Sequence, residues 1–255
     1  EPTARQSHID RALTNVAIGY RNAAYVWPEV FPRVPVQKQS DRYFLFDRDT
    51  AFRRVAKVRA AGSRAARSGY GITTTNQYVC LEKAIAHQVP DELIENSDDP
   101  LTPLVRGTEW CADQVQLEIE NDVLDLVFGN SIWSSSATPS TLWSSDAADP
   151  FGDIETGMNT VAGDIGREPN IGVIGRGLWR YLKNHPDVID RIKGGATTAN
   201  PAKAALEGVA AIVGLERILL AGAIEDTSLE PASSTFAYVG GAHMALLYVP
   251  SGPAL

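Results

Sequence analysis

Few side chains in this chain have the type and spacing that catalysis or metal binding requires. Its four histidines are far apart and have no carboxylate at the spacing of metal ligands: His8, His87, His185 and His243. His185 precedes Pro186 at a break in an apolar pattern, where capping or packing is a commoner role than proton transfer. Cys80 and Cys111 are each isolated, which excludes a paired-cysteine zinc site and a disulfide framework. The sequence therefore predicts no metal site and identifies no catalytic residue.

A glycine-rich stretch at 172–177 is the strongest candidate for a ligand site. Gly172, Gly175 and Gly177 follow a predicted strand and precede a predicted helix, as in a dinucleotide-binding turn. The glycine spacing is the reverse of that fingerprint, and neither a phosphate-binding loop nor a Gly-x-Ser-x-Gly turn occurs. We interpret these glycines as easing a strand-to-helix corner and predict no cofactor. An α/β enzyme with a ligand pocket near 172–177 stays open as an alternative.

Charge is distributed unevenly along the chain. The net charge is −8, yet only Asp47 and Asp49 oppose eight basic residues near the N-terminal third: Arg42, Arg48, Arg53, Arg54, Lys57, Arg59, Arg64 and Arg67. Two acidic blocks contain no base at all: Asp91, Glu92, Glu95, Asp98 and Asp99, and then Glu109, Asp113, Glu118, Glu120, Asp122 and Asp125. Such segregation favours docking of the basic segment on an acidic one, although two separately solvated faces would have the same pattern.

Composition excludes several classes of protein. Apolar residues make up 44% and charged residues 21%, which is typical of a folded globular chain. A net charge of −8 argues against a dedicated nucleic-acid-binding domain, because affinity for a duplex depends on neutralising phosphates. No apolar run is long enough to cross a membrane, and no charged-then-apolar leader opens the sequence. We expect no membrane partner.

The first ninety residues predict an arm followed by a hairpin. Residues 1–40 contain one short amphipathic pattern and then three prolines in eight residues, which favour an extended segment at 28–35. Its Trp27 and Phe31 have little core of their own and are expected to pack on the same chain or on a neighbour. Residues 41–90 predict a long two-stranded hairpin, with strands at 43–46, 51–58 and 72–89 and a basic, glycine-containing tip. A protruding ribbon of this kind suits contact with another subunit.

The remaining sequence predicts a long helix and then an α/β unit. Thr102 and Pro103 form a good helix start, and an apolar stripe continues to Gly129, which gives a helix of about 26 residues at 102–129. A serine-rich loop and a second amphipathic helix follow, at 131–149 and 154–165. From residue 170 strands alternate with helices: strands at 170–174, 217–220, 235–239 and 244–249, and helices near 178–192 and 201–213.

The order of these parts resembles that of tailed-bacteriophage major capsid proteins of the Hong Kong ninety-seven (HK97-like) type. The resemblance covers essentially the whole chain and is firmest at Asn170–Trp179 and Leu182–Asp187. Looser patterns carry the rest: Asn15–Asn22, Val30–Val36, Asp41–Phe44 and Arg59–Gly62.

The resemblance implies an α+β capsid fold with four parts. These are an N-terminal arm (1–40), an extended β-hairpin loop (41–90), a peripheral domain (91–169) that contains a spine helix at about 102–129, and an α/β axial domain (170–255). The family usually continues into a further C-terminal strand, so the axial domain is expected to be incomplete here. Some members crosslink through a loop lysine, but Lys57 stands among arginines without an identifiable asparagine partner, so crosslinking is not carried over.

The resemblance also implies a function without enzyme activity. It implies pentamers and hexamers of an icosahedral phage head that encloses double-stranded DNA without sequence-specific binding. It further implies portal, scaffold and decoration proteins as partners, assembly in the host cytoplasm and a place in the virion. An encapsulin-type nanocompartment shell has the same fold and stays open as an alternative.

From the charge pattern and the resemblance together we hypothesise two contacts between subunits. In the first, the basic loop lies across the acidic helix of the adjacent subunit, near Glu109, Asp113 and Glu120. The loop residues in this contact are Arg53, Arg54, Lys57, Arg59, Arg64 and Arg67. In the second, the arm around Trp27 and Phe31 holds an apolar surface of a neighbour.

Overall fold

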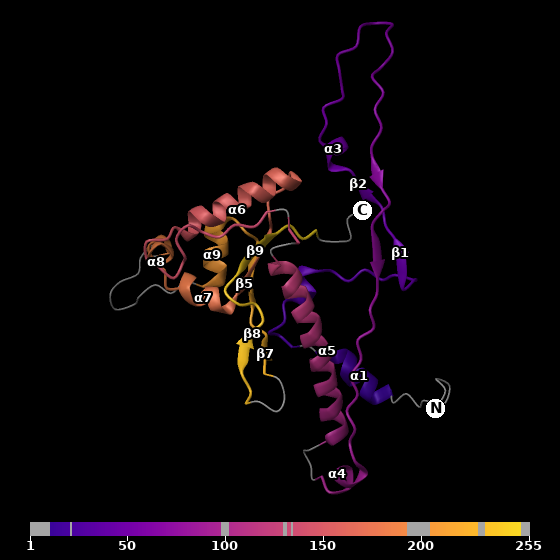
Figure 1. Ribbon diagram of the computed structural model, residues 1–255, viewed down its shortest axis with the longest axis vertical. Helices are drawn as coiled ribbons and strands as arrows, with labels where there is room; N and C mark the ends of the chain where they lie inside the picture. The colour runs from indigo at the N-terminus through magenta and orange to yellow at the C-terminus, as the bar shows by residue number, and fades with distance from the viewer. Residues whose placement is uncertain are drawn as a thin grey trace. The chain divides into compact units, whose positions relative to one another are not determined.

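The structure is a computed structural model that describes residues 11–20, 22–97, 102–129, 132–133, 135–192, 205–228 and 233–250. Helices and strands are mixed along the chain, as the predicted α+β class requires (Figure 1). The chain divides into two compact units. We call residues 33–83 the loop unit. We call the other unit, residues 1–32 and 84–251, the body.

A three-stranded sheet lies at the centre of the body. The strand β5 (Ile171–Gly175) pairs in parallel with β6 (Arg217–Ala221) and antiparallel with β9 (Met244–Leu247), so that β5 is the middle strand. Every residue of β5 is buried. Beyond the strands, the Asn170 side chain donates to the Val249 carbonyl oxygen (2.9 Å) and accepts from the Val249 amide (2.8 Å). This amide pair continues the β5–β9 ladder by one step.

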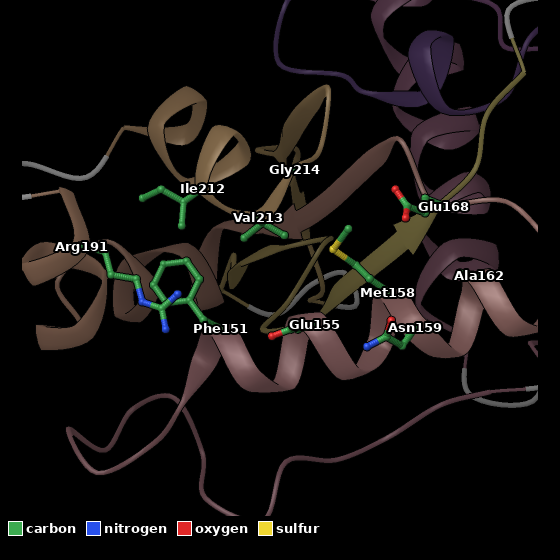
Figure 2. A pocket seen from close by; sticks show the side chains of 10 residues that line it. All are labelled: Phe151, Glu155, Met158, Asn159, Ala162, Glu168, Arg191, Ile212, Val213 and Gly214. Carbon is green, nitrogen blue, oxygen red and sulfur yellow. The ribbon is translucent and has the colours of Figure 1, made fainter.

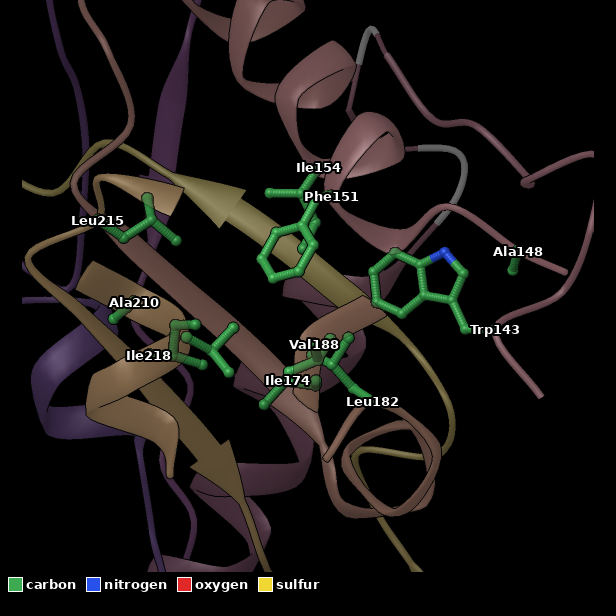
Figure 3. Packing of buried hydrophobic residues seen from close by; sticks show 11 residues of the cluster. Trp143, Ala148, Phe151, Ile154, Ile174, Leu182, Val188, Ala210, Leu215 and Ile218 are labelled. Atoms are coloured by element: carbon green, nitrogen blue, oxygen red, sulfur yellow. The ribbon is translucent and has the colours of Figure 1, made fainter. Parts of the chain in front are cut away.

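Four helices cover one face of this sheet. They are α6 (Pro150–Ile165), α7 (Arg176–Leu182), α8 (Pro186–Ile192) and α9 (Leu206–Val213). Asp149 caps α6 by accepting a hydrogen bond from the Gly152 amide (3.0 Å). Side chains from the helices and from Ile174 and Ile218 of the sheet form the first core cluster (Figure 3).

The other face of the sheet carries a second core cluster. Because side chains alternate along a strand, Ile171 and Val173 of β5 point away from Ile174. They pack with Leu124 and Val127 of α5 (Pro103–Phe128), a helix of 26 residues and about 39 Å. The helix expected at 102–129 is therefore present. The N-terminal helix α1 (Arg11–Gly19) also packs along α5, as Figure 1 shows.

The proline-rich segment differs from its prediction at one place. Residues 27–30 form a short helix, α2 (Trp27–Val30), where the sequence predicted extended chain from residue 28. Pro28 occupies the first turn, where a missing backbone N–H costs nothing, so proline does not exclude a helix there. Val26 and Val30 are buried in the second cluster and fix this turn to the body.

The loop unit is an antiparallel hairpin with little regular structure. Strand β1 (Ser40–Arg42) pairs with β4 (Gln77–Val79), and β2 (Leu45–Phe46) pairs with β3 (Ile72–Thr73). The predicted strand at 51–58 is absent, since α3 (Arg48–Ala51) is followed by irregular chain. The strand predicted at 72–89 is confined to β3 and β4. These segments have no second layer to cover them, and period-two patterning alone does not form long strands without one.

Three smaller elements complete the described part of the body. Helix α4 (Asp91–Glu95) packs near the start of α5. Strands β7 (Ile224–Asp226) and β8 (Phe236–Tyr238) pair as an antiparallel ribbon, of which the sequence predicted only the second strand. The helix predicted at 201–213 is present as α9 from residue 206, and residues 201–204 lie outside the described ranges.

Candidate interaction surface

The loop unit exposes large apolar side chains, although the rings of Phe46 and Tyr70 lie against each other, with their centres 5.9 Å apart. Phe44 is 70% exposed, Tyr70 73% and Leu81 81%, and Val58 is fully exposed. Gly62 takes a positive φ of 81° near the tip, which an L-residue rarely adopts, and so closes the turn there. Contiguous exposed apolar surface is typical of a protein–protein contact.

The basic residues predicted for this surface are accessible to solvent. All six are exposed, and none forms an ion pair with a described residue: Arg53, Arg54, Lys57, Arg59, Arg64 and Arg67. An ion pair of the loop unit joins Lys38 to Asp41 (2.7 Å) and leaves the tip uninvolved. The loop therefore presents uncompensated positive charge together with apolar groups.

Glu120, proposed above as an acceptor of a neighbour's arginines, is used inside its own chain. Its side chain is 0% exposed. The Val26 amide donates to both carboxylate oxygens (3.1 Å each), and the Trp27 amide donates to Oε2 (2.8 Å). The prediction is wrong for this residue, because a carboxylate enclosed by its own chain cannot receive an arginine from another.

The other two predicted acids differ in how available they are. Asp113 is half-buried and accepts hydrogen bonds from the Asn22 amide group (3.1 Å) and from the Tyr25 hydroxyl (3.0 Å). Burial, together with Asp113, raises the pKa of the Tyr25 hydroxyl well above its ordinary value. Glu109 faces Arg106 one turn away at 3.4 Å and keeps a third of its side-chain surface exposed. Of the three predicted acids, Glu109 and Asp113 are both half-buried, and Glu120 is fully buried.

The arm residues also contact their own chain. Phe31 packs against the second core cluster, and Trp27 is half-buried beside Glu120. Glu29 on the same turn pairs with Arg217 of β6. The expected contact of this arm with a neighbour's apolar surface is thus replaced, for Phe31, by packing on the body that carries it. The sequence had left both possibilities open.

Exposed acids that the hypothesis did not include lie on α4, next to the start of α5. Asp91, Glu92 and Glu95 are all exposed. They belong to the first acidic block of the sequence, so the signal was present. The prediction chose acids of α5 instead, because the second acidic block follows a regular helical stripe. Two of the three chosen acids, Asp113 and Glu120, bond residues of the arm.

The glycine corner at 172–177 is occupied by the chain itself. The Gly175 amide donates to the His243 carbonyl oxygen (2.9 Å), and the Gly177 amide donates to the Gly241 carbonyl oxygen (3.1 Å). A Cβ atom on Gly175 would collide with the Gly240 and Gly241 carbonyl oxygens. The glycines thus permit close packing of a backbone turn, and these two N–H groups are not free to bind a phosphate.

A pocket of the body lies elsewhere, between α6 and the ends of α8 and α9 (Figure 2). It has a volume of about 380 Å³, and both apolar and charged side chains line it, among them Met158, Val213, Glu155 and Glu168. The Arg191 guanidinium lies 4.3 Å from the centre of the Phe151 ring. Among the described residues, no group of three potential metal ligands comes together. No described helix is long and apolar enough to cross a membrane.

Comparisons with known proteins agree with the resemblance drawn from the sequence. The chain is 29% identical over 251 residues to the major capsid protein of Burkholderia phage BcepMu, covering 95% of this chain and 76% of that protein. It is 28% identical over 191 residues to the major capsid protein of Pseudomonas phage JBD67, covering 73% of this chain but only 60% of that protein. No protein family model matches the chain.

A solved structure shows the same fold. The crystal structure of a phage-related protein from Bordetella bronchiseptica superposes with a TM-score of 0.73, at 24% sequence identity, and the match covers 96% of this chain and 78% of that one. The similarity to phage major capsid proteins, inferred from the order of parts, is thereby confirmed over most of the chain.

Proposed function

We propose that this chain is the major capsid protein of a tailed phage and has the HK97-like fold. In this proposal it assembles into the pentamers and hexamers of an icosahedral head that encloses double-stranded DNA. The observation that carries the proposal is the similarity of nearly the whole chain to proteins named major capsid protein. The four parts then correspond to an arm (1–40), an extended loop (41–90), a peripheral domain (91–169) and an axial domain (170–255).

The loop unit gives this proposal its physical support. An isolated two-stranded ribbon is marginally stable in water at best, and this one exposes aromatic and aliphatic side chains along its length. Contact with an adjacent subunit would cover that surface. The apolar groups would supply most of the free energy of the contact, since an exposed ion pair contributes only about 0.2–1 kcal/mol.

The charged part of the contact needs a revised acceptor. Glu120 is unavailable, and Asp113 is engaged by Asn22 and Tyr25. We therefore propose that the loop cations of one subunit approach Glu109 and the exposed acids of α4 on another: Asp91, Glu92 and Glu95. Arginine suits this contact because its planar guanidinium can donate two hydrogen bonds to one carboxylate. A shell repeats each weak contact many times, so modest pair energies accumulate.

Charge reversal in the loop tests the proposal. We expect Arg53→Glu combined with Arg54→Glu to abolish assembly while the subunit keeps its circular dichroism and melting temperature, because both side chains are exposed and unpaired. The matched control reverses two exposed charges of the body, Arg180→Glu with Lys183→Glu. Particles are counted by electron microscopy and by sedimentation. Normal particles from the loop variant would contradict the proposed charged contact of Arg53 and Arg54.

The wild-type particles distinguish the proposed classes of protein. A closed shell that contains double-stranded DNA after growth with the other phage components supports a capsid, whereas a shell filled with a cargo enzyme supports an encapsulin-type compartment. A small discrete oligomer that never forms a shell would overturn both. Portal, scaffold and decoration proteins are the partners that the proposal implies, and the virion is the proposed location.

A further inference from the structure

The body contains a buried carboxylate that holds the arm against the long helix. Glu120 extends from the middle of α5 to the start of α2 and is completely removed from solvent. Its oxygens receive the Val26 and Trp27 amides at 2.8–3.1 Å. The same arm residues are anchored by packing, since Val26 and Val30 are buried next to Leu124 and Val127. Glu120 is therefore the polar centre of the contact between the arm and α5.

No cation accompanies this carboxylate among the described residues. Helix α1 has no titratable side chain between residues 12 and 19, and β9 has none. The arm contributes Tyr25, which bonds Asp113, and Glu29, which bonds Arg217. The other titratable groups that lie against α5 are the α4 acids, Tyr20 near Asp113, His87 against Trp110, and His243 against Phe128.

A buried carboxylate without a cation is costly to ionise. Burial raises the pKa of Glu120, and the Val26 and Trp27 amides lower it by less, so the net shift is upward. In the released arm the same side chain would meet water and regain an ordinary pKa. A group whose pKa is higher in the docked state binds its proton more tightly there, so proton uptake must favour docking. The neutral carboxyl still offers Oε2 to both amides, since each amide lies within 3.1 Å of that oxygen.

We propose that docking of the arm segment 22–31 on α5 is coupled to protonation of Glu120. The segment is held most tightly when Glu120 is neutral, and it opens more often as the carboxyl ionises. The coupling resides within one chain, and so it goes beyond the proposed capsid function and does not depend on it.

Hydrogen exchange tests the coupling at the two donors themselves. Exchange at the Val26 and Trp27 amides of the full chain is measured from about pH 4 to about pH 8, a range that spans ordinary and raised glutamate pKa values. Rates are corrected for the intrinsic pH dependence of exchange. Amides of Val173 and Ile174 in the buried strand β5 report global unfolding. We expect protection at Val26 and Trp27 to fall at least about threefold with rising pH, while protection in β5 stays constant.

Two variants identify the titrating group. Glu120→Gln keeps the shape and one acceptor oxygen but cannot ionise, so protection at the two amides should no longer change with pH. Asp125→Asn removes an exposed carboxylate from the same helix and should keep the wild-type profile. If Glu120→Gln fails to fold, the pH dependence of exchange at the Val26 and Trp27 amides of the wild-type chain still tests the proposal. Three results would overturn the proposal. Protection at the Val26 and Trp27 amides could stay constant or rise with pH, or it could be lost together with protection in β5. It could also keep its pH dependence in Glu120→Gln.

Discussion

At the scale of single residues, the body depends on two places where the chain touches itself closely. One is Glu120, where a carboxylate replaces the solvent around two backbone donors. The other is the corner between β5 and α7, where Gly175 meets the backbone at residues 240–241. The first excludes a predicted contact with a neighbour. The second excludes a phosphate-binding role for Gly175 and Gly177, because the amides of both residues already donate to backbone carbonyl oxygens.

The glycine corner leads to a prediction about stability. Gly175→Ala should destabilise the body by about 1–3 kcal/mol, because the new methyl group must displace carbonyl oxygens that cannot move without breaking the corner. Thermal or urea unfolding of the free subunit measures the loss. Gly163→Ala on α6 is the matched control, since its Cβ would enter open space and alanine favours a helix by up to about 1 kcal/mol. Equal stabilities for the two variants would contradict the close approach.

At the scale of elements, α5 acts as a support between the sheet and the arm. Its buried residues lie in its C-terminal half, at Glu120, Leu124 and Val127. Its N-terminal half keeps larger exposed side chains, such as Leu104 and Trp110, and the Trp110 ring lies 5.4 Å from that of His87. The C-terminal half of α5 thus lies in the core, whereas its N-terminal half, near which α4 packs, still leaves surface for further contacts.

This asymmetry predicts different effects of the same substitution along α5. Leu124→Ala should cost about 2–5 kcal/mol, because Leu124 is 1% exposed and its removal leaves a cavity in the second core cluster. Leu104→Ala removes the same atoms from a side chain that is 43% exposed, and should cost clearly less. Urea unfolding curves of both free subunits provide the comparison. A loss for Leu104→Ala as large as that for Leu124→Ala would show that the N-terminal half of α5 is also buried.

At the scale of the whole molecule, the chain consists of a body with two core clusters and a loop unit with none of its own. We expect such a body to remain folded without the loop. The exposed apolar groups of the loop fit the proposed contact with another subunit. A folded body with a separate exposed loop suits a contact that repeats between subunits of a shell, and it agrees with the similarity to phage major capsid proteins.

Removal of the loop tip tests whether the body folds without it and whether assembly requires it. Phe46 faces Ile72 in the hairpin register, so residues 47–71 can be replaced by Asn-Gly, a pair that suits a two-residue hairpin turn. We expect the shortened chain to keep the melting temperature of the body within a few degrees, roughly the effect of a change below 1 kcal/mol. It should form no closed particle by electron microscopy. Unfolding of the body, or normal shells, would show that the loop has a different role.

Most helices and strands, and the positive charge of the loop, could be predicted from the amino-acid sequence. Apolar periodicity was enough for α5, α6 and β5, because each buries one stripe or one whole strand. Clustered arginines without neighbouring acids were enough to predict an exposed basic surface, since unpaired cations are rarely buried. The alternation of apolar and polar residues in the loop wrongly predicted long strands, because the loop unit has no second layer of structure that would stabilise them.

Which of the acids of α5 are accessible depends on long-range packing, which the sequence pattern did not reveal. Glu109, Asp113 and Glu120 look alike in the sequence, and a helical wheel places them near one another. Their fates differ because the arm, almost a hundred residues earlier in the chain, folds back on α5 and encloses Glu120 while it bonds Asp113. Contacts between residues so far apart in the sequence depend on how the whole body packs, and the spacing of residues within one helix does not predict that packing.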